Sequence, residues 1–117
     1  EVRERFGDEQ MDASNRKILN MSEAEYESFQ NLGAEINERL EECVRTGASI
    51  ESEEAKEIVR LHRKWLCQTW KQYSANAHKA LAQSYTQDKR FLEYYDKNVL
   101  GCGELLKQAV DFWADKI

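Results

Sequence analysis

HRKWLCQTWKQYSANAHKALAQSYTQDKRF, residues 62–91, is the stretch of this chain that decides its fold. It holds both histidines and two of the three tryptophans, and apolar residues recur at helical spacing on either side of a break near residues 73–76. After the break, Ala77, Leu81 and Tyr85 share one helical stripe. Two helices so rich in aromatic and small residues predict a helical pocket for an apolar or aromatic guest.

Start and stop signals predict two helices before residue 73: one precedes the quoted stretch, and the other runs into it. Ser22 and Glu25 have the spacing of a capping box, in which each residue satisfies a backbone donor of the other. Gly47 suits a left-handed helix end, and Ser52 with two glutamates after it begins the next helix. The buried stripe predicted for the first of these helices consists of Tyr26, Phe29, Leu32, Ile36, Leu40 and Cys43. The inner face predicted for the second consists of Ala55, Ile58, Val59, His62, Trp65 and Leu66, continuing to Thr69 and Trp70.

The remaining segments complete an all-α prediction. Asp88 can cap a short helix that carries Phe91, and a last helix offers Leu106 and Val110 to the core. The chain has no proline and only five glycines among 117 residues, which favours helices joined by short turns. We therefore predict one domain of about five main helices over residues 22–117. Residues 1–21 are mostly polar and predict a weakly packed, mobile N-terminal segment.

Charge, cysteine usage and hydropathy exclude several classes of protein. The net charge of −5 argues against direct binding of nucleic acid, and residues 23–57 hold eleven acidic residues against three basic ones. Cys43, Cys67 and Cys102 are odd in number and widely spaced, as expected of reduced thiols in a cytoplasmic protein. No apolar run is long enough to span a membrane, and no signal peptide is recognisable. The start without Met suggests a piece of a longer protein.

No catalytic, metal or cofactor motif can be assembled from these residues. The chain lacks a metalloprotease helix motif, a Glu-x-x-His pair and a glycine-rich phosphate loop. Cys67 follows His62 by five residues, which places them about 140 degrees apart on a helix and separates nucleophile from base. We therefore expect no enzyme activity, no metal and no cofactor.

The histidines and aromatic residues allow more than one interpretation each. His62 is a hydrogen-bonded core histidine, or part of a pocket wall, where it donates to a ligand or fixes Tyr73 or Tyr85, or, as a third alternative, a haem ligand. His78 lies among alanines, which indicates either close helix packing or a cavity. Aromatic stripes usually belong to a core, but this small domain has more polar-tipped rings than its core requires, and binding sites favour such rings.

The chain resembles TipAS-type antibiotic-recognition domains, which lie at the C-terminal end of some MerR-family transcription activators. Glu1-Val-Arg-Glu-Arg-Phe-Gly7 is similar to the family's EEVRERWG-like start, and the Ser22–Tyr26 segment matches its capped helix. The strongest similarity is ungapped over about thirty residues. It consists of His62-Arg63, His78, Leu81, Tyr85 and Asp88-Lys-Arg-Phe91.

The resemblance implies a globin-like arrangement of helices without haem, with a cleft that takes up varied antibiotics. It also implies that the N-terminal segment closes over the drug as a lid, a coupled folding step. DNA would be bound only by a separate helix-turn-helix domain of a homodimeric full-length protein. The best-known member captures thiopeptides through a cysteine, and Ala80 stands at the matching position. This departure predicts reversible binding.

Taken together, these expectations describe an effector-binding domain that senses hydrophobic or macrocyclic drugs. The predicted ligand-binding residues are His62, Trp65, Trp70, Tyr73, His78, Ala80, Leu81, Tyr85 and Phe91, with Phe6 and Met11 from the lid. Two alternatives stay open: a stand-alone protein that sequesters a drug, and a helical module that binds a partner protein.

Overall fold

The computed structural model describes residues 19–117, which form five helices and no strand. The helices are α2 (Glu23–Thr46), α3 (Glu53–Cys67), α4 (Ala75–Gln87), α5 (Lys89–Asp96) and α6 (Cys102–Trp113). The prediction of an all-α domain with five main helices is confirmed. Phe6, Met11 and all but the last three residues of the predicted lid lie outside the described residues.

Local capping sets the ends of the helices as predicted. The Ser22 hydroxyl accepts from the backbone of Glu25, whose carboxylate accepts in turn from the backbone of Ser22. Ser52 and Asp88 accept from backbone donors of α3 and α5 in the same way. Gly47 ends α2 with φ of 69°, a left-handed conformation that glycine adopts without the clash of a Cβ atom.

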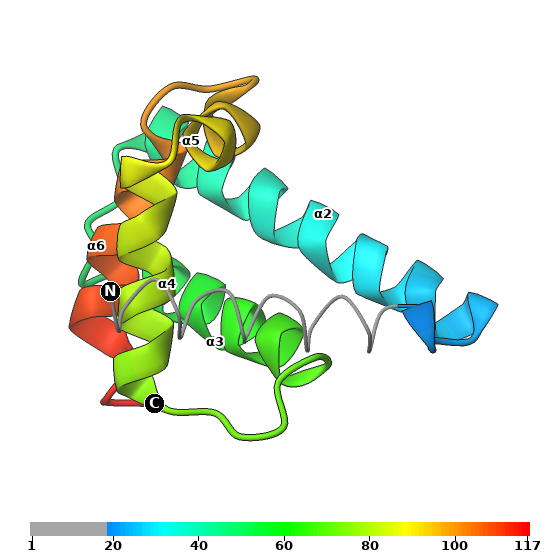
Figure 1. The fold of residues 1–117 in the computed structure, drawn as a ribbon. Coiled ribbons are helices and arrows are strands. Elements are labelled where there is room, and N and C mark those ends of the chain that lie inside the picture. Colours follow the sequence, from blue (N-terminus) through cyan, green and yellow to red (C-terminus); the bar gives the residue numbers. More distant parts are fainter. Residues whose placement is uncertain (1–18) are drawn as a thin grey trace.

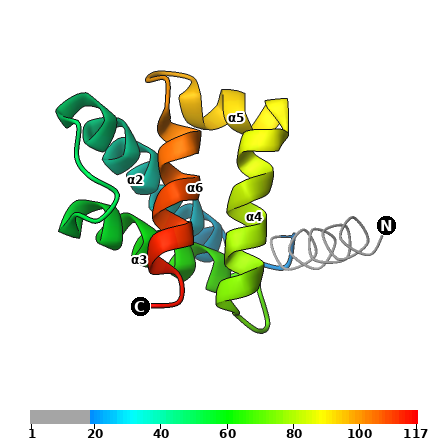
Figure 2. The ribbon, with the colours of Figure 1, turned by 90° about the vertical axis from the view of Figure 1, so that its left-hand side faces the viewer.

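Helices α2 and α3 form one pair, α4 and α5 form another, and α6 contacts both pairs (Figures 1 and 2). α4 and α6 run side by side with α5 across one end, and α2 contacts α3. α6 contacts all four other helices, so its inner face forms the centre of the core. Leu40, Val59, Leu106 and Val110 are fully buried there, and each such side chain stabilises the fold by roughly 1.5–3 kcal/mol.

Two expected helix faces differ from the observed ones. Tyr26 is 42% exposed, because it lies in the first turn of α2, at the end of the helix farthest from α6 (Figure 1). On α4 the inward face is turned by one residue: His78 is buried and Ala77 is only partly buried. This rotation follows from the contact of His78 with His62 on α3, which Ala77 could not make.

Long-range hydrogen bonds fasten the chain ends and loops of the described region to the bundle. The Trp113 indole donates to the backbone oxygen of Ile50 at 2.7 Å, which ties α6 to the loop before α3. The Lys79 ammonium donates to Asp115 at 3.0 Å, which holds the C-terminal residues against α4. None of the described helices combines the length and apolar character that crossing a membrane requires.

Candidate functional site

Four polar aromatic side chains form one hydrogen-bonded series between α3 and α4. The Tyr73 hydroxyl lies 2.6 Å from Nδ1 of His78, and Nε2 of His78 lies 2.7 Å from Nδ1 of His62. Nε2 of His62 lies 3.4 Å from the Tyr85 hydroxyl, a longer and weaker contact. We call Tyr73, His78, His62 and Tyr85 the histidine chain.

Each member is placed by the helix that carries it. His62 lies on the inner face of α3, one turn before the buried Leu66. His78 and Tyr85 are two turns apart on α4 and share its buried face with Ala82. Tyr73 comes from the linker between the helices, just ahead of Ser74, whose hydroxyl caps α4 by accepting from Ala77. The cap fixes where α4 begins and therefore how His78 faces Tyr73.

Burial keeps the histidine chain uncharged near neutral pH. His62 is 1% exposed, His78 0% and Tyr85 3%. Burial, with a smaller contribution from the nearby Arg63 guanidinium, lowers the pKa of His78 from 6.5 to about 4. Burial also lowers the pKa of His62 well below its usual range, with a smaller contribution from His78, and it raises the pKa of both tyrosines.

Partly exposed aromatic side chains lie at the rim of this buried series. The Trp65 ring stacks on Phe29 with centroids 4.9 Å apart and lies parallel to His62 at 5.7 Å. The Arg63 guanidinium lies 4.4 Å from the centre of the Tyr73 ring, a cation–π distance. We call Trp65 and Tyr73 the aromatic rim. Both rings are amphipathic. Phe29 and His62 support the Trp65 ring, and His78 contacts the Tyr73 hydroxyl.

The other predicted residues lie at different distances from the histidine chain. Trp70 is buried beside Tyr73, and Phe91 packs on Tyr85 with ring centroids 5.2 Å apart. Leu81 packs on the core and is partly exposed. Ala80 follows His78 by two residues, which places it about 200 degrees around α4 from that histidine. Ala80 therefore lies away from the side of α4 that carries the histidine chain.

Sequence reasoning missed several residues that the structure brings to this region. Phe29 stacks on Trp65, the Arg63 guanidinium lies over the Tyr73 ring, and Tyr95 packs on Tyr85 with ring centroids 4.9 Å apart. Phe29 was assigned only to a helix face. The pairing of rings from α2, α3 and α5 depends on helix packing, which a single sequence does not encode at any fixed spacing.

A hollow of about 520 Å³ lies one turn along α3 from the aromatic rim. Its described lining consists of Met21, Ala24, Glu25, Ser28 and Gln68. Gln68 follows Trp65 by three residues, so the hollow lies about one turn of α3 beyond Trp65, although neither Trp65 nor Phe29 is among its lining residues. None of these lining residues was predicted from the sequence, because short polar and apolar side chains at helix ends carry no binding signal.

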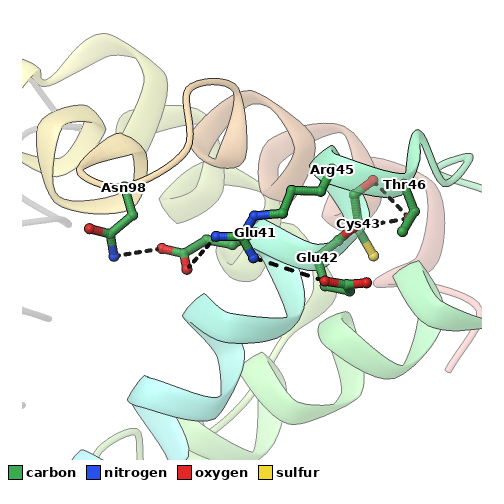
Figure 3. Close-up of polar contacts among 6 residues, drawn as sticks. All are labelled: Glu41, Glu42, Cys43, Arg45, Thr46 and Asn98. Atoms are coloured by element: carbon green, nitrogen blue, oxygen red, sulfur yellow. Dashed lines mark hydrogen bonds and ion pairs between the residues drawn. The ribbon is translucent and has the colours of Figure 1, made fainter.

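A second buried polar group joins α2 to the turn after α5 (Figure 3). The Glu41 carboxylate is 8% exposed and accepts from the Asn98 amide at 3.0 Å, with Arg45 at 3.9 Å. One turn earlier, the Asn37 amide donates to the Tyr94 hydroxyl at 3.0 Å. These bonds fix the position of α5 against α2 and account for a buried carboxylate.

Metal and thiol chemistry find little support in the described residues. Over residues 19–117, no three His, Cys, Asp or Glu side chains lie together as a metal site requires. Cys43 and Cys102 are buried, and burial raises the pKa of both thiols, in the case of Cys102 to about 11. Cys67, the last residue of α3, is exposed.

Comparison with known proteins gives one match. The family model described as the TipAS antibiotic-recognition domain matches residues 1–113, nearly the whole chain. No curated protein and no solved structure matches. The globin-like order of the helices therefore stays a prediction.

Proposed function

This chain belongs to the family of TipAS antibiotic-recognition domains, and we propose that it binds hydrophobic or macrocyclic antibiotics reversibly at the aromatic rim. The family match over residues 1–113 is the observation that carries the proposal. Trp65 and Tyr73 are partly exposed, rigidly supported and amphipathic, which suits them to contact a large ring-rich ligand.

The predicted site residues divide into two roles under this proposal. Trp65 and Tyr73 contact the ligand, and the buried His62, His78 and Tyr85 hold them in position. The hollow lined by Met21 and Gln68 would give the ligand room about one turn of α3 beyond Trp65. Contacts of the ligand with Trp70, Ala80, Leu81, Phe91, Phe6 and Met11 remain predictions.

We further propose that binding involves no covalent bond. Ala80 carries no nucleophile at the position where the best-known member of the family has its reactive cysteine. Cys43 and Cys102 are buried, and burial raises the pKa of both thiols. Cys67 is exposed. A Cys67→Ser variant is therefore expected to bind as the wild type does, and mass spectrometry should find no antibiotic adduct on either protein.

The biological role proposed is that of an effector domain of a MerR-type activator. The acidic net charge of −5 supports DNA contact through a separate basic domain rather than through this chain. The full-length protein would act as a cytoplasmic homodimer. A helix-turn-helix and a long heptad segment in the same reading frame would support this role, and their absence from the gene would favour a drug-sequestering protein.

A tryptophan-fluorescence titration tests the proposed binding. The panel contains unrelated hydrophobic antibiotics, thiopeptides included, and saturable quenching by several of them is expected. Trp65→Ala should weaken binding by about tenfold or more, because it removes a stacking surface at the rim. Trp113→Ala is the matched control, since it removes a partly buried indole that hydrogen-bonds to Ile50 at the other end of α3.

The two variants separate binding from stability. Trp113→Ala should leave affinity within about a factor of two, although both variants lower the free energy of unfolding by similar amounts. Equal losses of affinity would mean that the rim does not contact the ligand. No response to any antibiotic, together with tight binding of a protein partner, would make this domain a protein-interaction module.

A further inference from the structure

The histidine chain places two neutral imidazoles in series, each with a hydrogen-bond partner on both ring nitrogens. Tyr73 and His62 flank His78, and His78 and Tyr85 flank His62. A neutral imidazole has one nitrogen that donates and one that accepts. The proton on one ring therefore dictates the position of the proton on the other.

Only two arrangements satisfy every contact. In the first, Tyr73 donates to Nδ1 of His78, Nε2 of His78 donates to Nδ1 of His62, and Nε2 of His62 donates to Tyr85. In the second, every bond is reversed. Both histidines carry the proton on Nε2 in the first arrangement, and both carry it on Nδ1 in the second.

A mixed pair of tautomers is excluded by the short contact at the centre. It would set two N–H groups, or two bare nitrogens, 2.7 Å apart in a site from which water is excluded. Burying a polar group without its partner is strongly unfavourable, and two opposed donors add repulsion. Protonation of both ring nitrogens is opposed as well, because burial disfavours the imidazolium ion and lowers the pKa of both histidines.

The arrangement decides what Tyr73 can offer outside the bundle. In the first arrangement its proton points inward, so the phenolic oxygen can only accept a hydrogen bond from a ligand. In the second the oxygen accepts from His78, and its own O–H is free to donate outward. At the inner end, the Tyr85 hydroxyl can accept from Nε2 of His62 in the first arrangement and donate to it in the second.

We propose that His62 and His78 always share one tautomer and switch it together, so that Tyr73 serves as a hydrogen-bond donor or acceptor according to the ligand. The part that concerns a ligand rests on the proposed antibiotic binding, whereas the concerted tautomers are a property of the free protein. Tyr73 is thus a specificity-determining residue that accommodates ligands of opposite polarity without a change in backbone structure.

Nitrogen-15 NMR of the imidazoles in untagged, ligand-free protein at neutral pH tests the proposal. The chain contains only two histidines, so the ring-nitrogen spectrum reports the histidine chain alone. Protonated and bare ring nitrogens resonate far apart, and both rings are expected to show the same tautomer or the same mixture of the two. One Nδ1–H ring together with one Nε2–H ring would overturn the proposal.

Two ring-preserving variants should drive the pair in opposite directions. In Tyr73→Phe, Nδ1 of His78 loses its partner, and both histidines should favour Nε2–H, since an orphaned acceptor costs less than an orphaned N–H. In Tyr85→Phe, Nε2 of His62 loses its partner, and both should favour Nδ1–H. A ratio change of about fivefold or more is expected in at least one variant.

The decisive observation in each variant is the tautomer of the histidine that does not contact the substituted ring: His62 in Tyr73→Phe and His78 in Tyr85→Phe. Tyr26→Phe is the control, because that tyrosine is exposed and its hydroxyl bonds only to Gln30 among the described residues. A response confined to the adjacent histidine, or none in either variant, would overturn the proposal even if antibiotics bind. Conversely, a fluorescence titration without any response would overturn the proposed function. The concerted tautomers would then still be tested by the NMR result alone.

Discussion

At the scale of single residues, the two histidines show how far residue type alone can be interpreted. Sequence reasoning left His62 as either a core histidine or a residue that fixes Tyr73 or Tyr85. The structure buries it and sets it beside Tyr85, whereas Tyr73 is contacted by His78. His62 is therefore a core residue that supports the aromatic rim through its contacts with Trp65 and His78.

Acid should destabilise the protein through these histidines. Burial, aided by the Arg63 charge, lowers the pKa of His78 from 6.5 to about 4, and burial also lowers the pKa of His62, so the unfolded chain binds protons that the folded chain does not. The stabilisation is complete above pH 6.5 and is lost as the pH falls toward 4. From His78 alone, urea denaturation should find unfolding easier by roughly 2 kcal/mol at pH 5 than at pH 7.

The control for this prediction is the double variant His62→Gln/His78→Gln, in which only other groups titrate. Its free energy of unfolding should change little between pH 7 and pH 5. An equal slope in the double variant and the wild type would assign the acid sensitivity to carboxylates instead.

At the scale of helices, the local signals in the sequence were reliable. Ser22, Ser52 and Asp88 cap the helices that they were predicted to begin, and Gly47 ends α2. Such signals act through hydrogen bonds between residues only two or three positions apart, so tertiary packing has little influence on them. The errors concern tertiary placement: Tyr26 lies at the end of α2 farthest from α6, and the inward face of α4 is turned by one residue.

Replacing two glycines of the same helix by alanine should have opposite effects. Gly47→Ala forces a Cβ atom into a left-handed conformation and should lower the free energy of unfolding by about 1–2 kcal/mol, although nothing lies within 4 Å of that atom. Gly33→Ala lies within α2, where the new Cβ would be 3.4 Å from Nε1 of Trp65, an ordinary contact. It should raise the free energy of unfolding by about 0.5–1 kcal/mol.

Urea denaturation of both variants beside the wild type measures this difference. Because the substitution is chemically the same at both positions, the sign of each change isolates the backbone conformation. Destabilisation by Gly33→Ala would mean that α2 and Trp65 have no room for the added methyl group.

At the scale of the whole molecule, α6 joins the two pairs of helices. It contacts α2, α3, α4 and α5, and Leu106 and Val110 on its inner face are fully buried. A cavity at this position would remove contacts from several helices at once. The unfolding of the described region should therefore be a single cooperative transition that depends on α6.

Leu106→Ala should lower the free energy of unfolding by about 2–5 kcal/mol, a large share of the total stability of a small domain. Leu100→Ala is the matched control, since Leu100 is 81% exposed and the change should stay within about 0.5 kcal/mol. Thermal unfolding followed by circular dichroism measures both. A similar, small loss in the two variants would contradict the central position of α6.

The sequence by itself determined the helices, their capped ends, the surplus of polar-tipped aromatic rings and the membership of a family. These properties depend on contacts within one or two helical turns or on a pattern of residue types along the chain. Only the tertiary structure decided that Tyr73, His78, His62 and Tyr85 meet in one series and that a hollow forms between the start of α2 and Gln68 at the end of α3. Such contacts depend on the rotation and crossing of whole helices, and those are set by the summed packing of a core drawn from every helix described.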